Sequence, residues 1–95
     1  MPAYIIFTRE KLRDPAEMEK YKGKVPNSFP GHAVTPLVRY GRYEVLEGPG
    51  IEGAVVLQFP TFDEAKAWYN SPAYQEAVKH RFLAADYRAV IVEGM

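Results

Sequence analysis

The stretch Phe59-Pro-Thr-Phe-Asp-Glu-Ala-Lys-Ala-Trp-Tyr-Asn-Ser-Pro-Ala-Tyr-Gln75 contains more helix start signals than any other part of this chain. Thr61 and Glu64 have the spacing of a capping box, in which each side chain satisfies a free backbone N–H group at the start of a helix. Ser71 followed by Pro72 is a second helix start, because serine is a preferred N-cap and proline fits the first helical position. The stretch therefore predicts two consecutive capped helices.

Four strands and a third helix are predicted on either side of this stretch. Asp14, Pro15 and Glu17 form another helix start. Because proline disfavours helical angles in the residue before it, this helix is expected to end near Val25, ahead of Pro26. Runs rich in β-branched and aromatic residues predict strands at Ala3–Thr8, at Pro36–Tyr40 with a resumption at Tyr43–Leu46, at Ala54–Phe59 and at Tyr87–Glu93.

The order of these elements is β-α-β-β-α-β. The two consecutive helices together count as the second α of this order. This order predicts an α+β, ferredoxin-like fold with a four-stranded antiparallel sheet and the helices on one face. We expect residues 1–95 to form one domain, because no linker, repeat or low-complexity tract interrupts them. Helical spacing predicts buried stripes at Phe62, Ala65, Trp68 and Tyr69 and at Tyr74, Ala77, Val78 and Phe82.

The composition is that of a neutral globular chain with many aromatic residues. Twelve basic residues balance twelve acidic ones, which argues against electrostatic binding to nucleic acid or to an anionic membrane. No segment reads as a signal peptide or a membrane span. The absence of cysteine excludes disulfides and suits a reducing cytosol, so a cytoplasmic location is expected. Aromatic residues reach 14%, and a chain this short often shares its rings with a partner or a ligand.

Both faces of the predicted strands are apolar. In the first strand Ile5 and Phe7 point to one face, whereas Tyr4 and Ile6 point to the other. Two helical layers cannot cover both faces, and an antiparallel sheet with one wet face normally alternates apolar with polar residues. We therefore expect a twofold homodimer in which the open sheet faces turn toward each other. A monomer with an aromatic-rich open face is the alternative.

Five segments of the chain match a known pattern: Val45-Leu-Glu-Gly48, Phe59-Pro-Thr-Phe62, Ala67-Trp-Tyr-Asn-Ser-Pro-Ala-Tyr-Gln75, Arg81 and Val90-Ile-Val-Glu-Gly94. Together they resemble the uncharacterised family filed as domain of unknown function 1330, which belongs to the dimeric α/β-barrel group. That group also holds some cofactor-independent monooxygenases, muconolactone-isomerase-like enzymes and stress-response barrels. The resemblance covers nearly the whole chain and implies a dimer whose sheets face each other, but it implies no reaction.

The loop before the second strand departs from the family pattern, which places His-Gly-Gly ahead of a strand that ends in arginine. His32 matches the histidine and Arg39 the arginine, whereas Ala33 and Val34 stand where the glycines would be. Since glycine alone readily takes positive φ, the backbone of this loop is expected to differ. Pro36 removes a donor from the strand, which favours an edge position or the first residue of the strand.

A few residues are candidates for chemistry or ligand binding. His32 is a candidate acid or base because imidazole is the side chain best suited to that role, and Glu47 would take a proton if an apolar cavity raised its pKa. A surface histidine and a rim carboxylate are the structural alternatives. Arg39 and Arg81 can each bind a carboxylate or phosphate through paired N–H groups, or instead form an ion pair with Glu47 or Glu44 at the rim of the sheet. Tyr40 can line a ligand site or pack at a dimer rim.

No motif predicts a metal or a cofactor. His32 and His80 show no metal-binding spacing, and His80 is expected on the exposed side of a helix. No phosphate loop or dinucleotide fingerprint occurs, and Ser71 lacks the partners of a nucleophile.

Three hypotheses about function stay open at this point. The first is a homodimer that binds a small anionic or aromatic organic molecule. The second is a cofactor-independent enzyme, monooxygenase-like or isomerase-like, with His32 or Glu47 as its base. The third is an assembly module with no small-molecule site.

Overall fold

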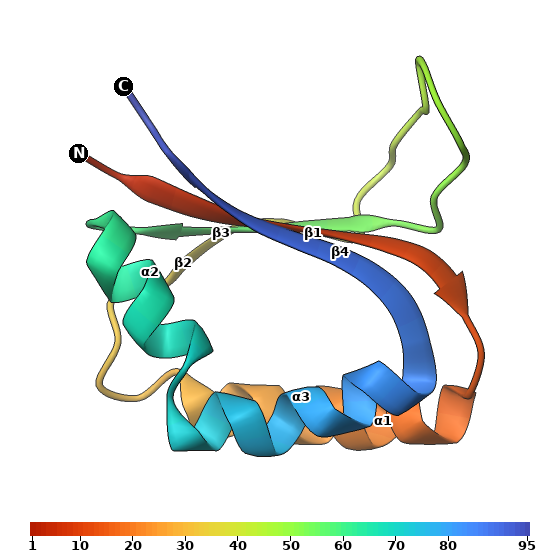
Figure 1. Cartoon of the computed structure of the whole chain (residues 1–95), viewed down its shortest axis with the longest axis horizontal. Helices are drawn as coiled ribbons and strands as arrows, with labels where there is room; N and C mark the ends of the chain where they lie inside the picture. The colour runs from red at the N-terminus through yellow and green to blue at the C-terminus, as the bar shows by residue number, and fades with distance from the viewer.

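The fold is a four-stranded sheet whose helices all lie on one face (Figure 1). The computed structural model describes residues 1–95 throughout. Its elements are β1 (Ala3–Leu12), α1 (Pro15–Lys24), the 3₁₀ turn η1 (Val25–Ser28), β2 (Thr35–Arg39), β3 (Ala54–Phe59), α2 (Phe62–Tyr69), α3 (Pro72–Ala84) and β4 (Ala85–Glu93). The strands lie in the order β2-β3-β1-β4 and every neighbouring pair is antiparallel, which confirms the predicted α+β, ferredoxin-like fold.

The helices start where the sequence predicts, because all three predicted caps form. Asp14, Thr61 and Ser71 each accept hydrogen bonds from backbone N–H groups in the first turn of α1, α2 and α3. The hydroxyl of Ser71 also donates to the backbone carbonyl of Trp68 over 2.7 Å. This second bond fixes the corner between α2 and α3, so the two helices form separate walls around the core.

Trp68 lies at the centre of the hydrophobic core and is 1% exposed. Its ring centroid is 4.1 Å from that of Tyr74 and 5.8 Å from that of Phe29, and the indole N–H donates to the hydroxyl of Ser28 over 3.1 Å. Ile5, Phe7, Leu57 and Phe59 of the sheet, with Val78 of α3, complete this cluster. The core therefore lies between the sheet and the helices, on the strand face that includes Ile5 and Phe7.

The structure corrects three predictions about local structure. Residues Tyr43–Leu46 do not form a strand, because β2 ends at Arg39, Tyr40 takes a positive φ of 51° and the chain leaves the sheet. Phe82 is 57% exposed and Phe62 is 38% exposed, although both were expected in buried stripes. Arg81, rather than Phe82, is the residue of α3 that faces the protein core.

The opposite face of the sheet, here called the open face, carries no helix. Val38, Val56, Ile6 and Val90 are paired across the four strands and form one row on this face. Val90 is 50% exposed and Val38 is 40% exposed. The loop of residues 40–53 rises from the same side of the sheet and carries the exposed residues Tyr43 and Leu46 (Figure 1). The open face is thus apolar and unpartnered within one chain.

None of the helices has both the length and the apolar character needed to cross a membrane. Pro36 lies in β2, which is an edge strand, as the missing N–H donor predicts.

Candidate functional site

A cavity of about 380 Å³ lies between the helix-covered face of the sheet and the segment formed by α1 and η1. Ten of its thirteen lining residues are hydrophobic. They come from every layer of the fold and include Phe7 of β1, Tyr21 of α1, Phe29 after η1, Leu57 of β3, Trp68 of α2 and Tyr87 of β4. Cavities of this size and lining hold small organic molecules.

The charged residues that line the cavity are both cationic. Lys22 of α1 and Arg39 of β2 line it and are exposed to solvent, and no aspartate or glutamate lines it. Arg39 is in none of the ion pairs of the structure, so the predicted alternative of a pair with Glu47 is not formed. The edge of the cavity therefore attracts anions more readily than cations.

Arg81 lies beside the cavity and is 3% exposed. Its guanidinium carbon is 4.8 Å from the ring centroid of Tyr87, 5.2 Å from that of Phe7 and 5.9 Å from that of Tyr21. These three rings also line the cavity. The Nε and Nη1 atoms of Arg81 are buried and have no hydrogen-bond partner. A buried cation without an acceptor is rare, because buried charges are normally paired.

Two pairs of tyrosine hydroxyls lie around this region. The hydroxyls of Tyr21 and Tyr74 are 2.8 Å apart, and those of Tyr40 and Tyr87 also form a hydrogen bond. Burial raises the pKa of Tyr21, Tyr74 and Tyr87 above the ordinary value of a phenol. These phenols therefore stay protonated near neutral pH and add no negative charge that would compensate Arg81.

Tyr40 holds its place at the cavity through an unusual backbone. Its φ of 51° is in the left-handed region, which non-glycine residues seldom occupy. The guanidinium of Arg9 lies over its ring at 5.1 Å, and a Cβ on Gly53 would come within 2.6 Å of ring atom Cδ1. Strained residues of this kind cluster at ligand sites, where the surrounding structure holds them in place.

The predicted ligand-binding residues separate into two groups in space. Arg39 and Tyr40 line the cavity, and Arg81 contacts three of the lining rings. His32 is half-buried in the loop before β2 and does not line the cavity. Glu47 is exposed in the loop of residues 40–53 and does not line the cavity. The catalytic roles of His32 and Glu47 stay predictions.

His80 was expected on the exposed side of a helix, but it pairs with Glu17 of the neighbouring helix. Its Nδ1 lies 2.8 Å from a carboxylate oxygen of Glu17, which links α3 to α1. No group of three or more histidine or acidic residues lies in an arrangement that could hold a metal ion.

Sequence reasoning did not select Tyr21, Tyr87 or Phe29 for the site, although all three line it. The sequence predicts Tyr87 only as the first residue of the last strand. The available signal was the number of tyrosines, since seven phenols in so short a chain need several polar partners inside it.

An α+β fold of ferredoxin-like topology with an apolar cavity beside its sheet defines the class of this protein. The chain belongs to the family described as "Domain of unknown function (DUF1330)", whose family model matches residues 2–95. None of the curated proteins with which the sequence was compared matches it.

Solved structures with the same fold support this class. A protein of unknown function from Rhodopseudomonas palustris is 22% identical, with a TM-score of 0.76 over 99% of this chain and 82% of that one. A dimeric ferredoxin-like protein of unknown function from Thermobifida fusca is 20% identical, with a TM-score of 0.62 over 97% and 90% of the two chains. Another dimeric ferredoxin-like protein, from Jannaschia sp. CCS1, is 14% identical, with a TM-score of 0.68 over 99% and 100%. At these identities the likeness shows the fold alone.

Proposed function

We propose that this protein is a cytoplasmic homodimer that binds a small anionic or aromatic organic molecule in the cavity between the sheet and α1. The observation that carries the proposal is the composition of the cavity wall. The wall is almost wholly apolar, its charged members Lys22 and Arg39 are cations, and no acidic side chain lines it.

The shape of the wall supports an aromatic ligand body. Phe29 and Trp68 stack with their ring planes 18° apart, and both line the cavity beside Tyr40. Because the faces of Trp68 pack against Phe29 and Tyr74, the wall offers ring edges to a flat ligand for edge contacts. Arg39 at the exposed edge can pair with an anionic group, as the sequence predicts.

The homodimer is supported by the row of Val38, Val56, Ile6 and Val90 on the open face. A contiguous apolar surface of this kind usually marks an interface. The proteins from Thermobifida fusca and Jannaschia that share the fold are themselves described as dimeric.

Trp68 provides a direct test of ligand binding, because it is the only tryptophan of the chain and lines the cavity. We expect aromatic acids and phenols to change its fluorescence in a saturable titration. The same compounds should raise the melting temperature. A ligand at about 100 times its Kd stabilises the folded state by about 2.7 kcal/mol, which raises the Tm of a domain of this size by roughly 10–20 °C.

A cavity-filling variant is the matched control for this titration. Val55→Phe adds bulk to a half-buried lining residue of β3 and should weaken binding while Trp68 still reports. The proposal fails if no small organic acid or phenol shifts either the fluorescence or the melting temperature at millimolar concentration.

A further inference from the structure

The guanidinium of Arg81 is surrounded by aromatic rings, but two of its buried nitrogen atoms have no hydrogen-bond acceptor. The rings of Tyr87, Phe7, Phe82 and Tyr21 have their centroids 4.8 to 5.9 Å from its guanidinium carbon. Such contacts favour the charge through the faces of the rings. They do not supply acceptors for the N–H groups in the guanidinium plane, and Nε and Nη1 have none. The side chain therefore holds a full charge and two unused donor atoms in an apolar place.

The surroundings contain no anion that would compensate this charge. Arg81 forms no ion pair, whereas Arg9, Arg13 and Arg88 each have a carboxylate within 3.8 Å. The phenols of Tyr21 and Tyr87 stay neutral, because burial raises the pKa of both hydroxyls. Burying an arginine is unfavourable unless a hydrogen-bonded counter-charge accompanies it. An acceptor from outside the chain can pair with these two donor atoms.

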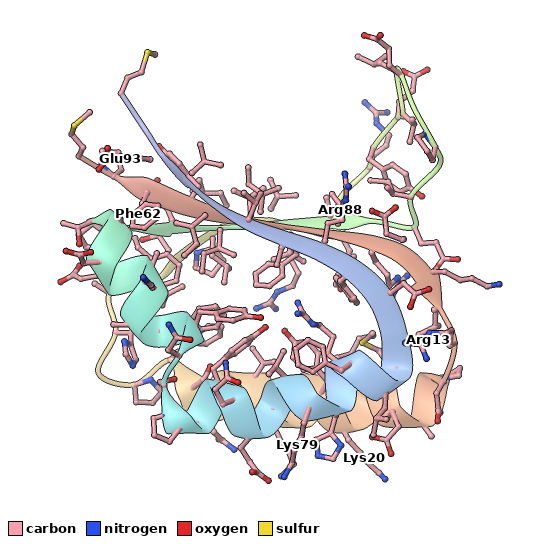
Figure 2. All side chains as sticks on the ribbon, in the orientation of Figure 1. Arg13, Lys20, Phe62, Lys79, Arg88 and Glu93 are labelled. Carbon is pink, nitrogen blue, oxygen red and sulfur yellow. The ribbon has the colours of Figure 1, made fainter.

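The cavity is the route by which an acceptor can reach Arg81. Phe7, Tyr21 and Tyr87 each contact the guanidinium and also line the cavity, whereas Arg81 itself does not line it. The guanidinium therefore lies directly behind this aromatic wall, and a carboxylate in the cavity reaches it when one of these rings moves aside. Figure 2 shows that side chains from the sheet and from the helices point into the space between the two layers. In the same view Lys20 and Lys79 point away from the sheet. Arg81, by contrast, is the one lysine or arginine among the buried residues of the fold.

We propose that Arg81 anchors the carboxylate of an aromatic monocarboxylic acid whose ring system lies against Trp68 and Phe29. This inference rests on the proposed function and names its ligand class. A carboxylate fits because its two oxygens accept several charge-assisted hydrogen bonds, and a guanidinium is the side chain best shaped to donate them. A single charge fits because the remaining wall is apolar, and the other cations, Lys22 and Arg39, are exposed to water.

Paired probes of equal shape test the anchor in the wild-type protein. We expect isothermal titration calorimetry to show that 2-naphthoate binds roughly 10- to 100-fold more tightly than 2-naphthamide, since hydrogen bonds to charged groups differ from neutral ones by about this factor. This comparison needs no mutation, so it does not depend on whether a variant folds. Equal affinities for the acid and the amide would overturn the anchor while leaving the proposed function intact.

Two variants then locate the charge that is responsible. Arg81→Gln should remove the preference for 2-naphthoate, and Arg39→Gln, at the exposed edge of the cavity, should leave most of it. A preference that survives in Arg81→Gln and disappears in Arg39→Gln would contradict the inference. If neither naphthyl compound binds but another acid or phenol does, the inference fails alone; if no compound binds, the proposed function fails as well.

A stability measurement on ligand-free protein separates an anchor from a structural cation. Arg81→Met removes a charge without a partner while keeping an unbranched side chain among the same rings, so we expect the melting temperature to rise. A clear fall in the melting temperature, with no preference of the wild type for the acid, would identify Arg81 as a structural residue held by its aromatic neighbours.

Discussion

The position of the Tyr40 ring depends on Gly53, because a Cβ atom at residue 53 would collide with the ring. Its ring packs against the guanidinium of Arg9 and close to Gly53, and its hydroxyl forms a hydrogen bond with that of Tyr87. Gly53 itself has a φ of +145°, which side-chain-bearing residues rarely adopt. The cavity edge at Tyr40 is therefore set by Gly53.

Gly53→Ala should destabilise the protein by about 1–3 kcal/mol and weaken ligand binding. The new Cβ would lie 2.6 Å from Cδ1 of Tyr40, so the ring must move, and the backbone would be strained in addition. Urea unfolding followed by circular dichroism measures the first effect. Gly50→Ala in the same loop is the control, because no atom lies within 4 Å of its added carbon and its φ is not positive. Equal losses in the two variants would show that Gly53 has no special role.

At the residue scale, sequence reasoning failed where hydropathy and helical spacing disagreed. The buried residues of α3 are Tyr74, Ala77, Val78, Arg81 and Ala84, which is the spacing of one helical face. Phe82 was preferred to Arg81 as a core residue because it is apolar, yet it lies on the next face and is exposed. A charged residue at a core position is a reason to propose a site there.

At the scale of elements, α1 and α3 are joined by a polar contact on their outer side. Glu17 of α1 accepts from Lys20 over 3.0 Å and lies 2.8 Å from Nδ1 of His80 on α3. Hydrogen bonding to His80, followed by that to Lys20, lowers the pKa of the Glu17 carboxyl below its ordinary value of 4.5. The contact thus ties the two long helices together while Glu17 is ionised.

Glu17→Gln should lower the urea midpoint near pH 7 and have a smaller effect in acid. A carboxyl whose pKa is depressed by folding stabilises the protein fully above its unfolded pKa, and this contribution disappears as the pH falls through the folded pKa. The difference between wild type and variant should therefore begin to shrink below about pH 4.5 and close once the pH has fallen past the lower pKa of the folded state. Glu19→Gln, on the same helix with an exposed partner at 3.8 Å, should change little. A difference that does not depend on pH would rule out this linkage.

The predicted elements were most accurate where caps mark them. Asp14, Thr61 and Ser71 define three helix starts by side-chain chemistry that is local in sequence, so no knowledge of the fold is needed. The predicted strand at Tyr43–Leu46 failed for the opposite reason. Its apolar pattern is real, but pairing is non-local, and the turn of the chain at Tyr40 removes it from the sheet.

At the scale of the whole molecule, the open face is the main feature that one chain leaves unexplained. The residues Val38, Val56, Ile6 and Val90 cross all four strands on that face. The two-sided apolar pattern was visible in the sequence, which is why a homodimer could be predicted without coordinates. The cavity could not be predicted in this way, because it depends on where helix and sheet side chains stop short of one another.

Val90→Asp should convert the proposed dimer into a monomer. The carboxylate would lie in the middle of an apolar interface without a partner, which costs several kcal/mol on each side of a twofold axis. Light scattering should then report the 10.8 kDa of one chain, against twice that mass for the wild type. Leu83→Asp on the exposed surface of α3 should remain dimeric. A wild-type mass of one chain at micromolar concentration would remove the dimer altogether.

The central position of β1 has a consequence for how the chain is made. This strand is synthesised first, yet its neighbours in the sheet begin at residues 54 and 85. At ordinary rates of translation, β4 is synthesised on the order of ten seconds after Ile5 and Phe7 of β1. The nascent chain therefore leaves the apolar strand β1 unpaired for longer than any other strand. Substitutions in β1 should change the dependence of folding on chaperones more than substitutions in the other strands.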